Sequence, residues 1–158
     1  MKNLFYLAII AFLCANSESQ PVQFQWVQTV NGGSGYGSQN VDKIVTDLYG
    51  NIYTTGAISQ PTSGRLYVRK TTPTGAVNWT YIYSNKSWGR DVIIDTLGNV
   101  YATGVDIVGS EEEIVVVKLN NSGQMQWIYK SNCSVLGGSQ GVKLALSSNQ
   151  NSIFVTGK

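Results

Sequence analysis

The sequence predicts an all-β protein built from antiparallel four-stranded units, and three observations point to this fold class. Residues 47–56 recur as residues 95–104, so two units are related by an offset of 48 residues. Each unit holds four short runs that are rich in β-branched and aromatic residues and are separated by turn residues. No stretch beyond residue 20 combines a helical apolar period with helix caps.

The first unit predicts four strands and the turns between them. A β-branched run stops at Asp47, whose side chain can cap a turn, and Gly50 supplies the positive φ that closes a short hairpin. The return strand is expected to end at Gly56, and a loop follows. Pro73-Thr74-Gly75 forms the next turn, and the last strand then alternates Val77, Trp79 and Tyr81 with polar residues. The expected strands are residues 41–46, 51–55, 66–71 and 77–83.

The second unit repeats this pattern, with strands expected at residues 90–94, 99–103, 114–120 and 124–130. The offset of 48 also carries Lys70 onto Lys118, Gly75 onto Gly123 and Trp79 onto Trp127. A weaker third copy of the first half runs from Ser147 to Gly157. An isolated copy of the last strand surrounds Trp26. Matches at one constant offset indicate a duplication.

These motifs resemble a known repeat. The succession G-G-S-x-x-G at 32–37, D-x-x-G-N-x-Y-x-T-G, V-x-K and G-x-x-x-W is similar to the β-propeller repeat of secreted and cell-surface proteins abbreviated SBBP. The resemblance covers about residues 22–158 and implies a propeller that acts as an interaction scaffold, with no common catalytic residue. Four antiparallel strands are the unit of a propeller blade. The blades would be residues 22–30 (a last strand), 41–83, 89–130 and 141–158 (a first half).

The repeats amount to about three blades, whereas a propeller typically closes with about four to eight. Open ends would expose strand edges and apolar faces. Two explanations remain: the sequence is a fragment of a longer propeller, which we favour, or copies self-associate and complete a ring by exchanging edges.

The first 19 residues predict a secretory signal peptide. Lys2 precedes a ten-residue apolar run that ends at Leu13, and small and polar residues follow. This run is too short for a stable transmembrane helix, so the protein is expected to be secreted or displayed at the cell surface. Cleavage would remove Cys14 and leave Cys133 as the only thiol, either buried or paired with another chain. Four sequons offer candidate N-glycosylation sites at Asn78, Asn85, Asn120 and Asn132.

Composition excludes several classes of function. The chain has no histidine, which excludes imidazole-based catalysis and histidine zinc sites. The net charge is +2 and charged residues are 13% of the chain, which gives no electrostatic footprint for nucleic acid. There is no EF-hand loop. We therefore expect no metal, no cofactor and no nucleic-acid partner.

Most repeated residues are expected to be structural. The aspartates would serve their turns through their own hydrogen bonds, and Trp79 and Trp127 would pack between neighbouring blades. The run Glu111-Glu112-Glu113 is expected in a solvated loop before a strand. The structural repeat positions are Asp47, Gly50, Asn51, Gly56, Asp95, Gly98, Asn99, Gly104, Trp79 and Trp127.

The connections between blades are the expected ligand face. Tyr36, Trp88 and Leu136 fall in successive connections, and Arg90 follows Trp88 closely. An aromatic side chain there could stack on a sugar or insert into a protein partner, or else cover the blade interface. We expect a non-catalytic binding or scaffold module for a protein or glycan partner. The alternatives are a fragment of a propeller hydrolase or lyase whose catalytic blades are missing, or a self-assembling structural unit.

Overall fold

The computed structural model describes residues 24–28, 40–60, 63–132 and 138–157, and these contain ten β-strands in three sheets. The strands are β1 (Asn40–Thr46), β2 (Ile52–Gln60), β3 (Ser63–Thr71), β4 (Val77–Ile82), β5 (Ser87–Ile94), β6 (Val100–Val108), β7 (Glu111–Leu119), β8 (Met125–Ser131), β9 (Gly141–Leu146) and β10 (Ile153–Gly157). The first sheet has the order β1-β2-β3-β4, the second has β5-β6-β7-β8, and the third pairs β9 with β10. The all-β class and the antiparallel four-stranded units are confirmed.

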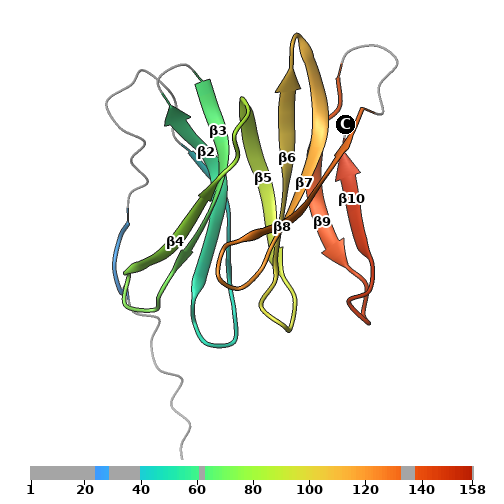
Figure 1. The fold of residues 1–158 in the computed structure, drawn as a ribbon. Helices are drawn as coiled ribbons and strands as arrows, with labels where there is room; N and C mark the ends of the chain where they lie inside the picture. The colour runs from blue at the N-terminus through green and yellow to red at the C-terminus, as the bar shows by residue number, and fades with distance from the viewer. Residues whose placement is uncertain (1–23, 29–39, 61–62, 133–137, 158) are drawn as a thin grey trace, which may run out of the picture.

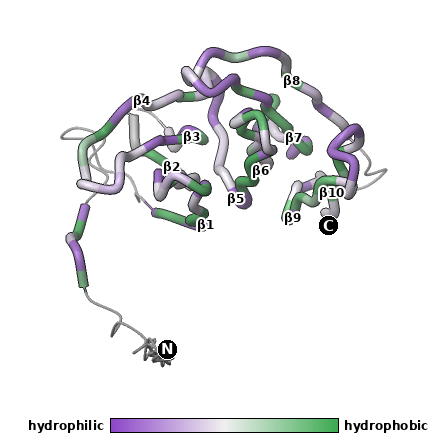
Figure 2. Tube along the Cα trace, turned by 90° about the horizontal axis from the view of Figure 1, so that it is seen from below, coloured by the Kyte–Doolittle hydropathy of each residue, from purple (hydrophilic) through white to green (hydrophobic). Residues whose placement is uncertain are grey.

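The three sheets stand face to face in sequence order (Figure 1). Seen from below, they form an arc with β1, β5 and β9 on its inner side and β4 and β8 on its outer side (Figure 2). Over the residues that the structure describes, the arc does not close into a ring. One apolar core lies between the first and second sheets and includes Tyr53, Val68 and Val117. A smaller core around Val116 and Leu144 lies between the second and third sheets.

The turns form for the reasons that the sequence suggests. Gly50 and Gly98 adopt φ of 77° and 80°, and Gly75 and Gly123 adopt φ of 90° and 78°. These values lie in the left-handed region that glycine enters without steric cost. The hairpins therefore fall where the turn residues and the 48-residue offset predict them.

The second and third strands of each unit are longer than predicted. β2 and β3 pair without interruption from Ile52↔Thr71 to Gln60↔Ser63. Gly56 and Gly104 do not end a strand but lie inside β2 and β6. A Cβ on Gly56 would overlap the main-chain carbonyl of Asn40. The glycine is needed for this close approach of two strands, and not for a turn.

The predicted loop at Glu111–Glu113 is wrong, because β7 begins at Glu111. The three glutamates pair with Val108, Ile107 and Asp106 of β6, and Gly109-Ser110 makes the turn. Residues 24–28 lie outside any strand. They contact the first sheet through Trp26, whose indole Nε1 donates to the carbonyl of Pro73 at 2.9 Å.

Candidate functional site

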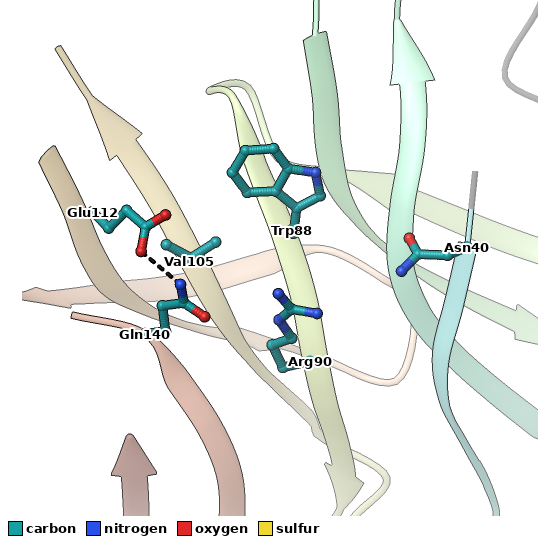
Figure 3. Close-up of a pocket in the computed structure, with 6 residues that line it drawn as sticks. All are labelled: Asn40, Trp88, Arg90, Val105, Glu112 and Gln140. Carbon is teal, nitrogen blue, oxygen red and sulfur yellow. Dashed lines mark hydrogen bonds between the residues drawn. The ribbon is translucent and has the colours of Figure 1, made fainter. Parts of the chain in front are cut away.

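A hollow of about 410 Å³ opens where the inner strands of the sheets begin, and it is the candidate site. Its lining brings together residues of β1, β5, β6 and β7 with one residue that precedes β9 (Figure 3). The lining residues are Asn40, Trp88, Arg90, Val105, Glu112 and Gln140. Polar side chains therefore surround an indole ring.

Three of these residues occupy the same position in successive sheets. The carbonyls of Asn40, Trp88 and Gln140 each lie against a glycine of the neighbouring strand that has no room for a Cβ. In each sheet that glycine follows a threonine, and the three are Gly56, Gly104 and Gly157. The backbone repeats while the side chain changes, so this position can vary in chemistry without disturbing the fold.

Trp88 is half-buried near the start of β5, where it pairs with Val105. Its Nε1 side lies against Gly64, at which an added Cβ would come within 3.0 Å of Nε1. The Lys86 ammonium lies 5.8 Å from the centre of the indole ring, a distance at which a cation is attracted to an aromatic face. The ring is thus held in place by its neighbours and offers a flat apolar surface beside polar groups.

The arginine side of the hollow is a small hydrogen-bonded network. Arg90 makes an ion pair of 3.3 Å with Asp42. Asn40 donates to the other oxygen of Asp42 at 2.5 Å, and its own side-chain oxygen accepts from the amide of Ala57 at 2.9 Å. The amide of Asn40 and the guanidinium of Arg90 are held by one carboxylate.

The opposite side of the hollow carries Glu112 and Gln140. The Gln140 side-chain amide donates to Glu112 at 2.6 Å (Figure 3). A second hydrogen bond, from the Ser139 amide to the Glu112 carbonyl at 2.7 Å, fixes the chain that leads into β9. In the part of the chain that the structure describes, no ion pair joins Glu112 to Arg90. The two charged residues of the hollow are therefore not paired with each other: Arg90 is held by Asp42, and Glu112 accepts from Gln140.

The structure brings together two of the four predicted ligand-face residues. Trp88 and Arg90 line the same hollow, whereas Tyr36 and Leu136 lie outside the described residues. Trp88 was expected in a connection, but β5 begins one residue earlier, at Ser87, which pairs with Asp106. Glu112 and Gln140 were not predicted as ligand-face residues. Aligning Gln140-Gly141 with Trp88-Gly89 would have revealed Gln140.

The repeated aspartates serve their turns. In the first sheet, Asp47 accepts from the amides of Tyr49 and Asn51 at 2.9 Å, from the Asn51 side chain at 2.8 Å and from the Tyr53 hydroxyl at 3.1 Å. Asp95 repeats the four contacts 48 residues later. Burial alone would raise the pKa of Asp47, but the hydrogen bonds from Asn51, Tyr49 and Tyr53 outweigh it and hold the pKa below its usual 3.8.

Two other carboxylates are buried between sheets. Asp106 is fully buried, makes an ion pair with Lys130 and accepts from the Tyr83 hydroxyl at 3.0 Å. The hydrogen bond to Asp106 raises the pKa of Lys130. Asp91, on the inner strand β5, lies 3.9 Å from Lys43 of β1 and 4.0 Å from Lys143 of β9. Neither carboxylate lines the hollow.

The sequons differ in their surroundings. Asn78 is exposed in β4, and Asn85, Asn120 and Asn132 lie between strands. The amide nitrogen of Asn120 donates to Gln124 at 2.9 Å, and that of Asn132 donates to Glu111 at 2.8 Å. The predicted signal peptide, Cys14 and Cys133 lie outside the described residues.

The described ranges hold no group of three or more acidic, cysteine or histidine residues arranged for a metal. They also contain no helix with the length and hydropathy needed to cross a bilayer. The sequence matches no protein-family model and none of the curated proteins compared with it.

Proposed function

We propose that the chain is a secreted or cell-surface protein of β-propeller repeats that binds a glycan, without catalysis, in the hollow around Trp88. In this proposal the three sheets are successive blades, and their arc is part of a propeller ring. The predicted signal peptide supports the secreted location, and the duplicated repeat with its resemblance to the SBBP family supports the propeller.

One observation carries the proposal. The equivalent positions of the three sheets converge on one hollow with a tryptophan between two amide side chains, beside Arg90 and Glu112. Sugars present apolar C–H faces and a rim of hydroxyls that both donate and accept. An indole suits the faces, and amide, guanidinium and carboxylate groups suit the hydroxyls. The volume of about 410 Å³ falls within the roughly 300–1,000 Å³ of small-ligand sites.

The lining favours binding over hydrolysis. Most glycoside hydrolases use a pair of carboxyl groups that flank the scissile bond. The hollow is lined by a single carboxylate, Glu112, which accepts a hydrogen bond from Gln140. Nothing in this lining supplies the second carboxyl group.

A glycan array with the purified chain tests the proposal. We expect a defined set of glycans to bind and the signal to fall about tenfold or more in Trp88→Ala, because the stacking surface is lost. Arg90→Met should weaken the same glycans, because it removes the charged donors and keeps the aliphatic stem.

Trp127→Ala is the matched control, since Trp127 is also a partly exposed strand tryptophan but lies outside the hollow. It should leave glycan binding unchanged. Thermal melts of each variant separate loss of binding from loss of fold. Binding that is retained in folded Trp88→Ala would exclude this site, and binding to a protein but to no glycan would change the ligand class.

A further inference from the structure

A second, apolar groove of about 520 Å³ lies between the outer strand β8 and the two-stranded third sheet. It shares no lining residue with the hollow around Trp88. Its walls come from β7, β8 and β10, and its residues are Val116, Trp127, Ile128, Tyr129, Ile153 and Val155. Within the described residues, β10 pairs with β9 alone, so its other edge borders this groove without a partner strand.

The same kind of groove is filled elsewhere in the molecule. Trp79, on β4, packs its indole against Gly123 in the turn between β7 and β8. Its Nε1 donates to the carbonyl of Asn121 in that turn at 3.0 Å. Trp26 packs in the same way on Gly75, and its Nε1 donates to Pro73 at 2.9 Å. Each tryptophan is therefore seated on the glycine turn of the next sheet.

Trp127 is the third tryptophan of this series, but among the described residues no glycine turn packs against it. It is 37% exposed, and in the described chain its indole nitrogen has no hydrogen-bond acceptor. Lys118 likewise lacks the contact that its counterpart in the first sheet makes. Its counterpart Lys70 lies over Tyr53 and donates to the Asn121 side chain at 2.6 Å. Lys118 lies over Tyr101 at 5.2 Å, but among the described residues no further turn offers it an acceptor.

The third sheet also has an uncovered aromatic side chain. Tyr53 and Tyr101 occupy equivalent positions in β2 and β6 and are only 1% and 6% exposed. Their counterpart in β10, Phe154, is 58% exposed. Tyr53 is covered by a lysine and a tryptophan from the third and fourth strands of its own sheet. The described part of the third sheet has no such strands to cover Phe154.

The filled groove also shows which strand fits. Between the first two sheets, β7 contributes Val115, Val117 and Leu119, and all three are fully buried. They alternate along one face of the strand, and the glycine turn that receives Trp79 follows directly. The occupant of such a groove is thus a hairpin with an alternating aliphatic strand and an Asn-x-x-Gly turn.

We propose that the groove between β8 and β10 binds a β-hairpin of this type, which adds its first strand to the free edge of β10. Main-chain hydrogen bonds to β10 supply affinity, and the aliphatic side chains fill the apolar wall. The turn of the hairpin places a positive-φ glycine against Trp127, one carbonyl for the indole N–H, and one side-chain oxygen for Lys118. The occupant is a partner polypeptide that presents this hairpin, and not a second copy of this chain.

A synthetic peptide of residues 107–132, which contains β7, its turn and β8, is the probe. Titrated into the purified full chain and followed by calorimetry, it should bind with one-to-one stoichiometry. Trp127→Ala in the chain should weaken binding about tenfold or more, because the seat of the glycine turn is lost. Trp88→Ala should leave peptide binding unchanged, which separates this groove from the proposed glycan site.

Peptide variants provide a matched glycine control. Gly123 and Gly109 both have positive φ, but an added Cβ at Gly123 would collide with the tryptophan that it faces, whereas at Gly109 it would meet nothing within 4 Å. The Gly123→Ala peptide should lose binding, and the Gly109→Ala peptide should bind much more tightly than it. Equal binding by the two, or binding that survives Trp127→Ala, overturns the proposal. Self-association of the chain that the peptide does not compete would assign the groove to a second copy and overturn it as well.

Discussion

At the scale of single residues, the repeated aspartates show how one carboxylate organises a turn. Asp47 takes four hydrogen bonds from Tyr49, Asn51 and Tyr53, and these hold its pKa below 3.8. The folded chain therefore takes up a proton at this group at a lower pH than the unfolded chain does. The stabilising contribution is complete above the unfolded pKa of about 3.9 and is lost as the pH falls through the folded value.

Asp47→Asn tests this account. The variant should lower the free energy of unfolding by about 1–2 kcal/mol at pH 7, because an amide cannot accept all four hydrogen bonds. Urea unfolding between pH 7 and pH 2.5 should show the difference from the wild type shrinking as the pH drops below about 4. A difference that stays constant across this range would mean that the charge of Asp47 does not contribute.

The glycine of the Thr-Gly pair is limited by space rather than by φ. An added Cβ at Gly104 would overlap the main chain of Trp88, which cannot move without breaking the pairing of β5 with β6. We expect Gly104→Ala to cost about 3 kcal/mol or more. Gly109→Ala should cost only about 1–2 kcal/mol, because its positive φ is strained but its surroundings are open. Denaturant midpoints of the two variants would be compared, and equal losses would contradict the steric account.

At the scale of the strands, an ion pair between a buried carboxylate and a partly exposed lysine links three elements. Asp106 of β6 bonds to Lys130 of β8 and to the hydroxyl of Tyr83, which follows β4. Lys130→Met leaves the carboxylate buried without its cation, and we expect a loss of about 3 kcal/mol in chemical denaturation. The double variant Asp106→Leu with Lys130→Met should recover part of this loss, since no unpaired charge remains. A double variant that is less stable than the single one would contradict this account, because Asp106 would then stabilise the fold through its other hydrogen bonds even without Lys130.

The strands also show what the sequence could and could not predict. The hairpin turns follow from local chemistry, in which an aspartate, a proline or an asparagine is followed by a glycine that must adopt positive φ, and all four lie where expected. Strand length does not follow from local chemistry. Gly56 resembles a strand end until the main chain of Asn40 is seen to pass over it, and the glutamates of β7 resemble a loop until their partners in β6 are known.

At the scale of the whole molecule, the three sheets differ in how much each is covered. The second sheet lies between the other two, and Val115, Val116 and Val117 of β7 are almost completely buried. The third sheet has two described strands, and Phe154 on β10 is exposed. Amide hydrogen exchange should therefore be slowest in β6 and β7 and fastest in β9 and β10. Uniform protection across the three sheets would contradict this gradient, and protection gained in β10 on adding the hairpin peptide would support its docking there.

The candidate site could be predicted only in part, for a reason that belongs to the same scale. Trp88 and Arg90 are two residues apart on one strand, so the sequence could pair them. Glu112 and Gln140 reach the hollow from other strands and connections, and their approach depends on how the sheets pack. The repeat predicts that three equivalent positions exist, but only the arc of sheets shows that they face one space.

The charges on the inner strands have a further consequence. Asp91 lies between Lys43 and Lys143, and its remaining oxygen accepts from the amide of Leu144 at 3.0 Å. Units derived from one repeat have similar apolar faces, and such faces alone would allow them to stack in several orders. If either outer unit took the central place, it would set one lysine beside another and leave the carboxylate with a single cation. The alternation of Lys43, Asp91 and Lys143 along the three inner strands thus favours the observed order of the sheets over the other orders.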